Sequence, residues 1–209
     1  NYATRLFEFP LGVFGIAIAT AIFPTLARQA SNPALFAHAL RRGIRLALFI
    51  GLPASAGLIV VRTHLTTVVF QGGKFNADDT IRVATILLGF APAVVAFSVM
   101  QTITRAFYAL GDTSTPTRIS IWMVCLNLLL NCTLIWTPLN TSGLAWSTTI
   151  CAFIQAGILI YILHGRVNNL FDIHTRMASV KIFAATLVMT VIITLIALVL
   201  PVGMSAIAH

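Results

Sequence analysis

Long runs of apolar residues, separated by short polar segments, extend along the whole chain. A membrane-spanning helix needs about 20 consecutive and mostly apolar residues. Six stretches meet this requirement, so the pattern predicts an all-α polytopic membrane protein with six transmembrane helices. The predicted spans are 3–27, 42–62, 78–110, 117–137, 142–164 and 179–201.

Residues that favour helix ends stand at the borders of the third and fourth spans. Asn76 precedes Asp78 and Asp79, which predicts a capped helix start with acidic residues in its first turn. Gly111 predicts the end of that helix. Thr115-Pro116 predicts the N-cap and the first residue of the next helix.

Two shorter segments flank the second span. Asn32-Pro33 predicts the start of a short helix over residues 33–43. The segment "THLTTVVFQGG", residues 63–73, is too short to cross a bilayer, so we expect it to lie at the membrane interface.

Composition agrees with a membrane protein. Of the 209 residues, 58% are hydrophobic and 9% are charged, and the mean hydropathy is +0.96. Soluble domains carry about 25% charged residues, so lipid must cover much of this surface. The chain begins at Asn1 without a signal-peptide pattern, and we expect it to be an internal part of a longer protein.

Basic residues are distributed unequally between the two sets of helix ends. Nine lie on one side: Arg28, Arg41, Arg42, Arg45, Arg105, Arg118, Arg166, Arg176 and Lys181. Four lie on the other: Arg5, Arg62, Lys74 and Arg82. Because cytoplasmic loops carry an excess of Lys and Arg, the first set is predicted to face the cytoplasm. This topology accounts for most of the net charge of +8, so no nucleic-acid partner is expected.

The sequence offers little support for enzyme chemistry. It has five carboxylates and lacks the HExxH, P-loop and nucleophile-elbow motifs. Cys125, Cys132 and Cys151 lie within apolar runs and lack the spacing of a metal site. We therefore expect neither a metal nor a cofactor.

The first span begins with a charged pair. Arg5 and Glu8 share one helix face with the small residues Gly12 and Gly15. An arginine inside a membrane costs roughly 2.5–3.5 kcal/mol on insertion scales, so it needs a partner or water. Glu8 is one such partner for Arg5. In this interpretation the two charged side chains face a polar cavity. The alternative is that Arg5 extends to the outer membrane surface and pairs there with Glu8, without a role in binding.

Three spans contain an internal proline: Pro10, Pro53 and Pro92. A proline inside a helix removes a backbone hydrogen bond and bends the helix. Interrupted helices are typical of transporters, which favours a moving protein, although static kinks that assist packing are the alternative.

Polar residues in later spans permit two interpretations. Ser98, Gln101, Thr102 and Arg105 follow helical spacing, so they either line the cytoplasmic mouth of a cavity or bond neighbouring helices. A second polar set comprises Asn127, Asn131 and Thr148. Its oxygens suit a hard cation, but without a carboxylate the interpretation as interhelical hydrogen bonding is favoured.

Several segments resemble one known family. They are "RLFEFPLGVFGIAIATAIFPTLARQA", "GLPASAGLIV", "FQGGKFNADDT", "RAFYALGDTSTPTRIS" and "GLAWSTTI", and they occur in the family's order. By these segments the chain resembles the MurJ/MviN family, the lipid II flippases. The resemblance covers nearly the whole chain.

The resemblance implies a fold similar to the multidrug/oligosaccharidyl-lipid/polysaccharide exporters. The chain would match family helices 8 to 13. Residues 1–164 would form part of the second helical bundle, 165–178 a cytoplasmic loop, and 179–209 an additional C-terminal helix and tail. The first bundle of the same protein would be its partner, within the bacterial inner membrane and its lipids.

The resemblance also implies a function and a site. Family members transport lipid II, a disaccharide-pentapeptide on undecaprenyl diphosphate, by alternating access. Arg5 and Glu8 align with substrate-cavity positions, and Pro10, Gly12, Gly15, Pro53 and Pro92 would serve as gate or hinge residues. Some relatives have a sodium site near Asn127, Asn131 and Thr148, but the absence of an acidic ligand here argues against one.

Other functions fit the same pattern. A drug–cation antiporter or an O-antigen-type lipid flippase would share the fold, but an antiporter needs acidic residues inside the bundle. A membrane scaffold that binds a lipid precursor without transporting it would not need three interrupted spans.

Overall fold

The computed structural model describes residues 2–70, 75–137, 141–167, 170 and 172–199, and helices dominate them. The first span comprises α1 (Tyr2–Pro10), η1 (Leu11–Gly15) and α2 (Ile16–Gln29), and α3 (Pro33–Phe70) follows. The remaining helices are α4 (Ala77–Phe90), α5 (Ala93–Ala109), α6 (Ser114–Leu134), α7 (Thr141–Arg166) and α8 (Ile173–Val199). By length and composition five helical segments can each cross a membrane, and the bent pair α4–α5 makes a sixth. The predicted number of spans is confirmed.

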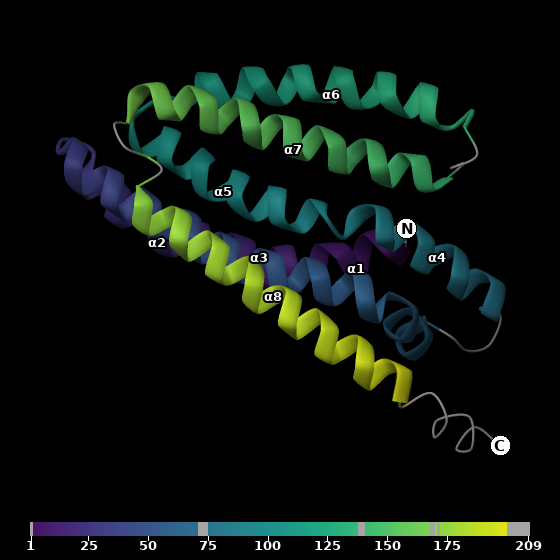
Figure 1. Ribbon diagram of the computed structural model, residues 1–209. Coiled ribbons are helices and arrows are strands. Elements are labelled where there is room, and N and C mark those ends of the chain that lie inside the picture. The colour runs from purple at the N-terminus through teal and green to yellow at the C-terminus, as the bar shows by residue number, and fades with distance from the viewer. Residues whose placement is uncertain (1, 71–74, 138–140, 168–169, 171, 200–209) are drawn as a thin grey trace.

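The helices run up and down in one elongated bundle (Figure 1). At one edge α6 packs mainly against α7, which in turn packs against α4 and α5. The middle of the bundle contains α3 and the first span, and α8 covers α3 at the opposite edge. The ends of α2, α5 and α7 lie at the same end of this bundle as the starts of α3, α6 and α8 (Figure 1). These are the helix ends that carry the larger set of basic residues, so the arrangement agrees with the predicted alternation of spans.

The first span is interrupted where proline predicts a break. α1 ends at Pro10, and the next five residues form a π-helix before α2 begins. Proline has no N–H to donate, so the regular α-helical hydrogen-bond pattern is interrupted at this position. The interruption predicted for the first span is confirmed.

The second span is longer than predicted. α3 is one helix of 38 residues that includes the predicted short helix 33–43 and the first eight residues of the predicted interfacial segment 63–73. Its start agrees with the prediction, because the Asn32 side chain accepts hydrogen bonds from the N–H groups of Ala34 and Leu35. The short helix 33–43 continues into the second span, as expected, whereas the predicted limit at 62 was wrong because no Gly or Pro interrupts residues 63–70. Pro53 lies inside this helix.

The third predicted span consists of two helices. α4 and α5 meet at Ala91 and Pro92 with a bend of 40°, which confirms the predicted break. At the start of α4, the Asn76 N–H donates to the Asp79 carboxylate at 3.2 Å. At the end of α5, Gly111 has φ of +77°, a left-handed conformation that glycine adopts without strain.

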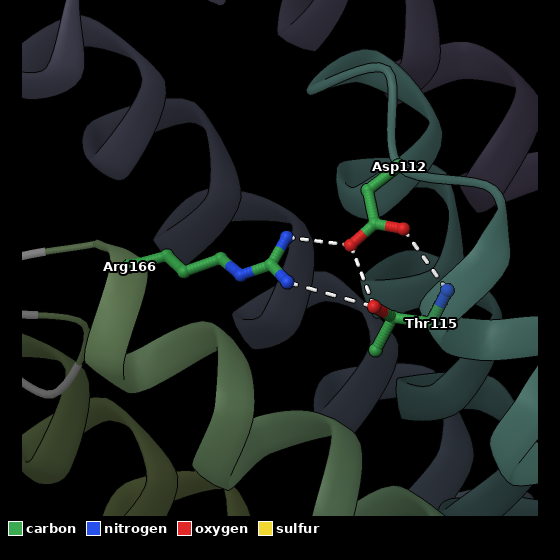
Figure 2. A network of polar contacts seen from close by, with 3 residues as sticks. All are labelled: Asp112, Thr115 and Arg166. Carbon is green, nitrogen blue, oxygen red and sulfur yellow. Dashed lines mark hydrogen bonds and ion pairs between the residues drawn. The ribbon is translucent and has the colours of Figure 1, made fainter.

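A polar network joins the ends of three helices (Figure 2). Asp112 accepts hydrogen bonds from the Thr115 N–H at 2.9 Å, the Thr115 hydroxyl at 2.7 Å and the Arg166 guanidinium at 2.6 Å. These bonds lower the pKa of Asp112 to about 2, with those from Thr115 as the main cause. The predicted cap was therefore wrong by two residues: α6 begins at Ser114, and Asp112 accepts the bond from its first turn.

The last two helices also differ from the predicted limits. α7 ends at Arg166 and α8 begins at Ile173, so the connection between them is shorter than the predicted loop 165–178. An ion pair of 3.4 Å between Arg41 and Asp172 joins the start of α8 to α3. The tail of the predicted C-terminal segment, 200–209, lies outside the described residues.

Two groups of buried residues form the core, one towards each end of the bundle. The first lies near the basic helix ends and includes Leu26, Phe36, Leu40, Ile103, Phe107 and Leu163. The second lies near the opposite end and includes Phe7, Leu58, Leu87, Val94 and Ala152. Together the two groups position the first span against α3, α4 and α5.

Candidate functional site

A groove lies between the start of the first span and the second half of α3. Its volume is about 650 Å³. Arg5 is its charged lining residue, and the other lining residues are apolar or glycine: Leu6, Phe9, Pro10, Ala54, Gly57, Leu58, Leu65, Val69 and Phe70. The groove therefore combines one cation with a long hydrophobic wall, which suits an amphiphile with an anionic head.

Aromatic rings hold the two walls of this groove together at one end. The Tyr2 ring lies 4.8 Å from the ring of Phe70 and 5.5 Å from that of Phe75, between centroids. Further along α1, Phe7 stacks on Phe90 at 5.2 Å and contacts Phe97 at 5.8 Å. Aromatic pairs at these distances add stability beyond their buried area, so α1 has a defined position beside α3 and α4.

Arg5 has no carboxylate partner among the residues that the structure describes. The ion pairs found there join Arg41 to Asp172 and Arg166 to Asp112. Glu8 lies one turn after Arg5, is exposed and does not line the groove. The expected pairing of Arg5 with Glu8 is therefore absent, and the guanidinium remains available to bind an anion.

The glycines of the predicted hinge occupy different environments. Gly15 is buried, and a Cβ added there would lie 3.3 Å from the Gln101 side chain of α5. Gly12 is exposed, and a Cβ there would meet nothing within 4 Å. Hence Gly15 permits close contact between the π-helix and α5, whereas Gly12 has open space beside it.

The residues of the predicted polar stripe on α5 have different surroundings. Ser98 is 4% exposed and lies against Gly51, and Thr102 is fully buried against Gly43. These two residues pack α5 against α3, and the Thr102 hydroxyl donates within α5 to the Ser98 carbonyl at 3.3 Å. Both interpretations of the stripe stay predictions. Arg105 instead lies over the Phe23 ring of α2, 6.0 Å from its centroid.

The second polar set joins α6 to α7. The Asn131 side chain donates to the Asn127 amide oxygen at 3.0 Å, and the Ser147 hydroxyl donates to the Asn131 amide oxygen. Thr148 instead donates to the carbonyl of Leu144 at 2.9 Å. Across the described part of the chain, no three His, Cys, Asp or Glu side chains gather as a metal site. The contacts are those of interhelical hydrogen bonding.

Sequence reasoning missed most of the apolar wall of the groove. Leu65, Val69 and Phe70 fall within the segment expected at the membrane interface, and the sequence pattern does not mark them as part of a site. The spacing of Leu65 and Val69, four residues apart, is a signal that α3 continues with an apolar face.

Comparisons with known proteins agree with this architecture. The model of the family described as lipid II flippase MurJ matches residues 1–209, the whole chain. The chain belongs to the MurJ family. Accordingly, it is a multi-pass membrane protein, as the apolar pattern predicts.

Individual members of the MurJ family are longer than this chain. A Vibrio cholerae protein named "Probable lipid II flippase MurJ" is 36% identical over 165 residues, which cover 78% of this chain and 31% of that protein. A Rickettsia prowazekii protein of the same name is 30% identical over 202 residues, covering 93% and 39%. The chain thus spans about a third of the length of these relatives.

A solved structure supports the same fold. "Lipid II flippase MurJ, inward closed conformation" has a TM-score of 0.81 and 24% sequence identity to this chain. The match covers 93% of this chain and 40% of the other. The helical arrangement is therefore that of part of a MurJ protein.

Proposed function

We propose that this chain is part of a flippase that moves lipid II across the bacterial inner membrane by alternating access. Membership of the MurJ family supports lipid II as the substrate and the bacterial inner membrane as the location. The transported molecule passes through without a covalent step, so the protein is a transporter and not an enzyme. The first helical bundle of the same protein would complete the substrate cavity.

The observation that carries this proposal is the pairing of Arg5 with an apolar groove. Lipid II joins a diphosphate to a long hydrocarbon chain, so it is anionic at one point and hydrophobic along most of its length. A guanidinium binds phosphate oxygens through two parallel hydrogen bonds. In the proposal Arg5 binds the diphosphate, and the wall that includes Phe9 and Val69 contacts the start of the hydrocarbon chain.

Release of the substrate requires that this binding remain weak enough to reverse. Glu8, one turn from Arg5, lowers the net positive charge near the groove and thereby limits the affinity for the diphosphate. Pro10, with the π-helix that follows it, supplies a flexible joint next to the arginine. Pro92 supplies a second joint at the bend between α4 and α5, and Pro53 a third position within α3.

Complementation tests the proposal. Cells depleted of their own flippase would express the full-length parent protein, its Arg5→Ala variant or its Arg82→Ala variant at matched levels. Arg82 is exposed, lies on the same side as Arg5 and does not line the groove, so it is the matched control. We expect the parent and Arg82→Ala to restore lipid II in the outer leaflet. Arg5→Ala should restore at least tenfold less lipid II there, since charge-assisted contacts contribute about 1.5–3 kcal/mol.

Two outcomes would contradict the proposal. A correctly inserted parent that restores no lipid II exposure would exclude the flippase function. Equal restoration by Arg5→Ala and Arg82→Ala would keep the function and exclude Arg5 as the diphosphate ligand.

A further inference from the structure

A second pocket lies at the opposite end of the bundle from Arg5. It is formed between the first turns of α3 and the start of α8 and has a volume of about 190 Å³. All six of its lining residues are polar or charged: His38, Arg41, Arg45, Asp172, His174 and Thr175. This space is large enough for a small polar group and several waters.

The charges around this pocket favour an anion. Asp172 is already engaged, because it lies 3.4 Å from Arg41 and accepts a hydrogen bond from the Ile173 N–H at 2.6 Å. Arg45 is partly buried and has no ion-pair partner in the described part of the chain. One guanidinium therefore remains uncompensated, beside two histidines that carry further N–H groups.

A buried hydroxyl provides an independent indication of a ligand. Thr175 is 2% exposed, lines the pocket, and its Oγ1 atom has no hydrogen-bond partner within the described structure. Buried polar groups almost always have a partner, since leaving one unsatisfied costs about 1–3 kcal/mol. A bound oxyanion would accept the hydrogen bond that this hydroxyl can donate.

The surroundings of the pocket indicate where the anion comes from. The neighbouring residues of α8 present exposed apolar side chains, with Ile173 58%, Met177 56% and Val180 69% exposed. The pocket lies at the basic end of membrane-spanning helices, where lipid headgroups gather at the membrane surface. A phosphoryl group in the pocket would thus be joined to acyl chains that lie along α8.

We propose that this pocket binds the phosphoryl group of an anionic phospholipid, with Arg45 and the Thr175 hydroxyl as its main ligands. Binding at this position joins the start of α8 to α3 through the lipid headgroup. The site is separate from the Arg5 groove and does not depend on lipid II transport.

Lipid titration of the full-length parent protein in detergent tests this proposal. The probes are phosphatidylglycerol, phosphatidylcholine and inorganic phosphate, and the readout is the midpoint of thermal unfolding. We expect phosphatidylglycerol to raise the midpoint more than phosphatidylcholine does. Arg45→Gln should need about tenfold more phosphatidylglycerol for half of the effect, a change of about 1.4 kcal/mol. Thr175→Val, which preserves side-chain size, should need about threefold more.

Arg176→Ala is the matched control, because Arg176 is an exposed arginine at the same end that does not line the pocket. It should respond to phosphatidylglycerol as the parent does. Equal losses in Arg45→Gln and Arg176→Ala, or equal effects of the two lipids, would overturn the proposal. A response to inorganic phosphate alone would overturn the lipid as the source of the phosphoryl group. If Arg45→Gln does not fold, an unchanged response in Thr175→Val would overturn the role of the hydroxyl.

Discussion

Charged residues in this chain differ in whether an opposite charge lies beside them. Asp112 and Arg166 neutralise each other at the basic end of the bundle, with a hydrogen bond of 2.6 Å between them. Arg5 lies in an apolar groove and has no carboxylate within ion-pair distance among the described residues. Paired charges stabilise helix connections, whereas an unpaired guanidinium keeps its hydrogen-bond donors available for a ligand.

Removal of the Asp112 charge should destabilise the protein in a pH-dependent manner. The pKa of Asp112 is about 2, below its usual value of 3.8, so its stabilising effect is complete above about pH 4 and is lost as the pH falls through 2. Asp112→Asn should lower the unfolding temperature at pH 6 by roughly 2–4 °C. The difference from the parent should decrease between pH 4 and pH 2. Asp78→Asn, at an exposed aspartate, controls for the lost charge. A difference that stays constant from pH 6 to pH 2 would contradict the prediction.

Sodium should not stabilise the polar set on α6 and α7. The Asn127 amide oxygen already accepts a hydrogen bond from Asn131 and the Asn131 amide oxygen accepts one from Ser147, and the set contains no carboxylate. Exchange of potassium chloride for sodium chloride at equal concentration should leave the unfolding temperature unchanged. Asn131→Asp, which supplies a carboxylate, is the variant whose unfolding temperature is compared in the same two salts. A sodium-dependent rise in the unchanged protein would reinstate the cation site.

At the scale of the element, prolines and glycines decide where helices break and how closely they approach. Pro10 precedes a π-helix and Pro92 lies at a bend of 40°, whereas Pro53 lies within a continuous α3. Sequence alone predicted all three positions but not this difference. A proline removes one hydrogen bond in every case, and the packing of neighbouring helices decides whether the helix continues.

Close helix contact at Gly43 should not tolerate a larger residue. A Cβ at this position would lie 2.6 Å from Ile22 Cδ1 and 2.9 Å from Thr102 Cγ2. Gly43→Ala should therefore destabilise the protein by about 1–3 kcal/mol through overpacking. Gly57→Ala, in the same helix with nothing within 4 Å, should be neutral or stabilising by up to about 1 kcal/mol. Thermal unfolding of both variants checks this, and equal effects would contradict it.

At the scale of the whole molecule, the distribution of basic residues follows the alternation of the helices. The basic ends of α2, α5 and α7 lie together with the starts of α3, α6 and α8 (Figure 1). Because positively charged segments are retained in the cytoplasm, one end of the bundle should face the cytoplasm and the end with the Arg5 groove should face outwards.

Cysteine labelling tests this orientation. In a background without Cys125, Cys132 and Cys151, single cysteines would replace the exposed residues Ser31 and Asp78 of the full-length protein. A membrane-impermeant maleimide added to intact cells should label Asp78→Cys and leave Ser31→Cys unlabelled. The reverse result would invert the topology and place the Arg5 groove at the cytoplasmic side.

The sequence by itself determined the number of spans, the ends of the first and third spans to within two residues, and the alternation of basic ends. These properties depend on local physics, namely the length of apolar runs, the backbone preferences of Pro and Gly, and the charge of short connections. Asn76, Pro92 and Gly111 accordingly have the local roles that their chemistry predicts.

Only the tertiary structure decided which polar residues form sites. Thr102 and Gln101 are adjacent in sequence, yet one is buried against Gly43 and the other faces the π-helix at Gly15. Likewise, the groove at Arg5 exists because the end of α3 lies beside α1, more than fifty residues away in the chain. Contacts of this kind depend on how distant helices pack, and the pattern of one segment carries no information about the segment that it will meet.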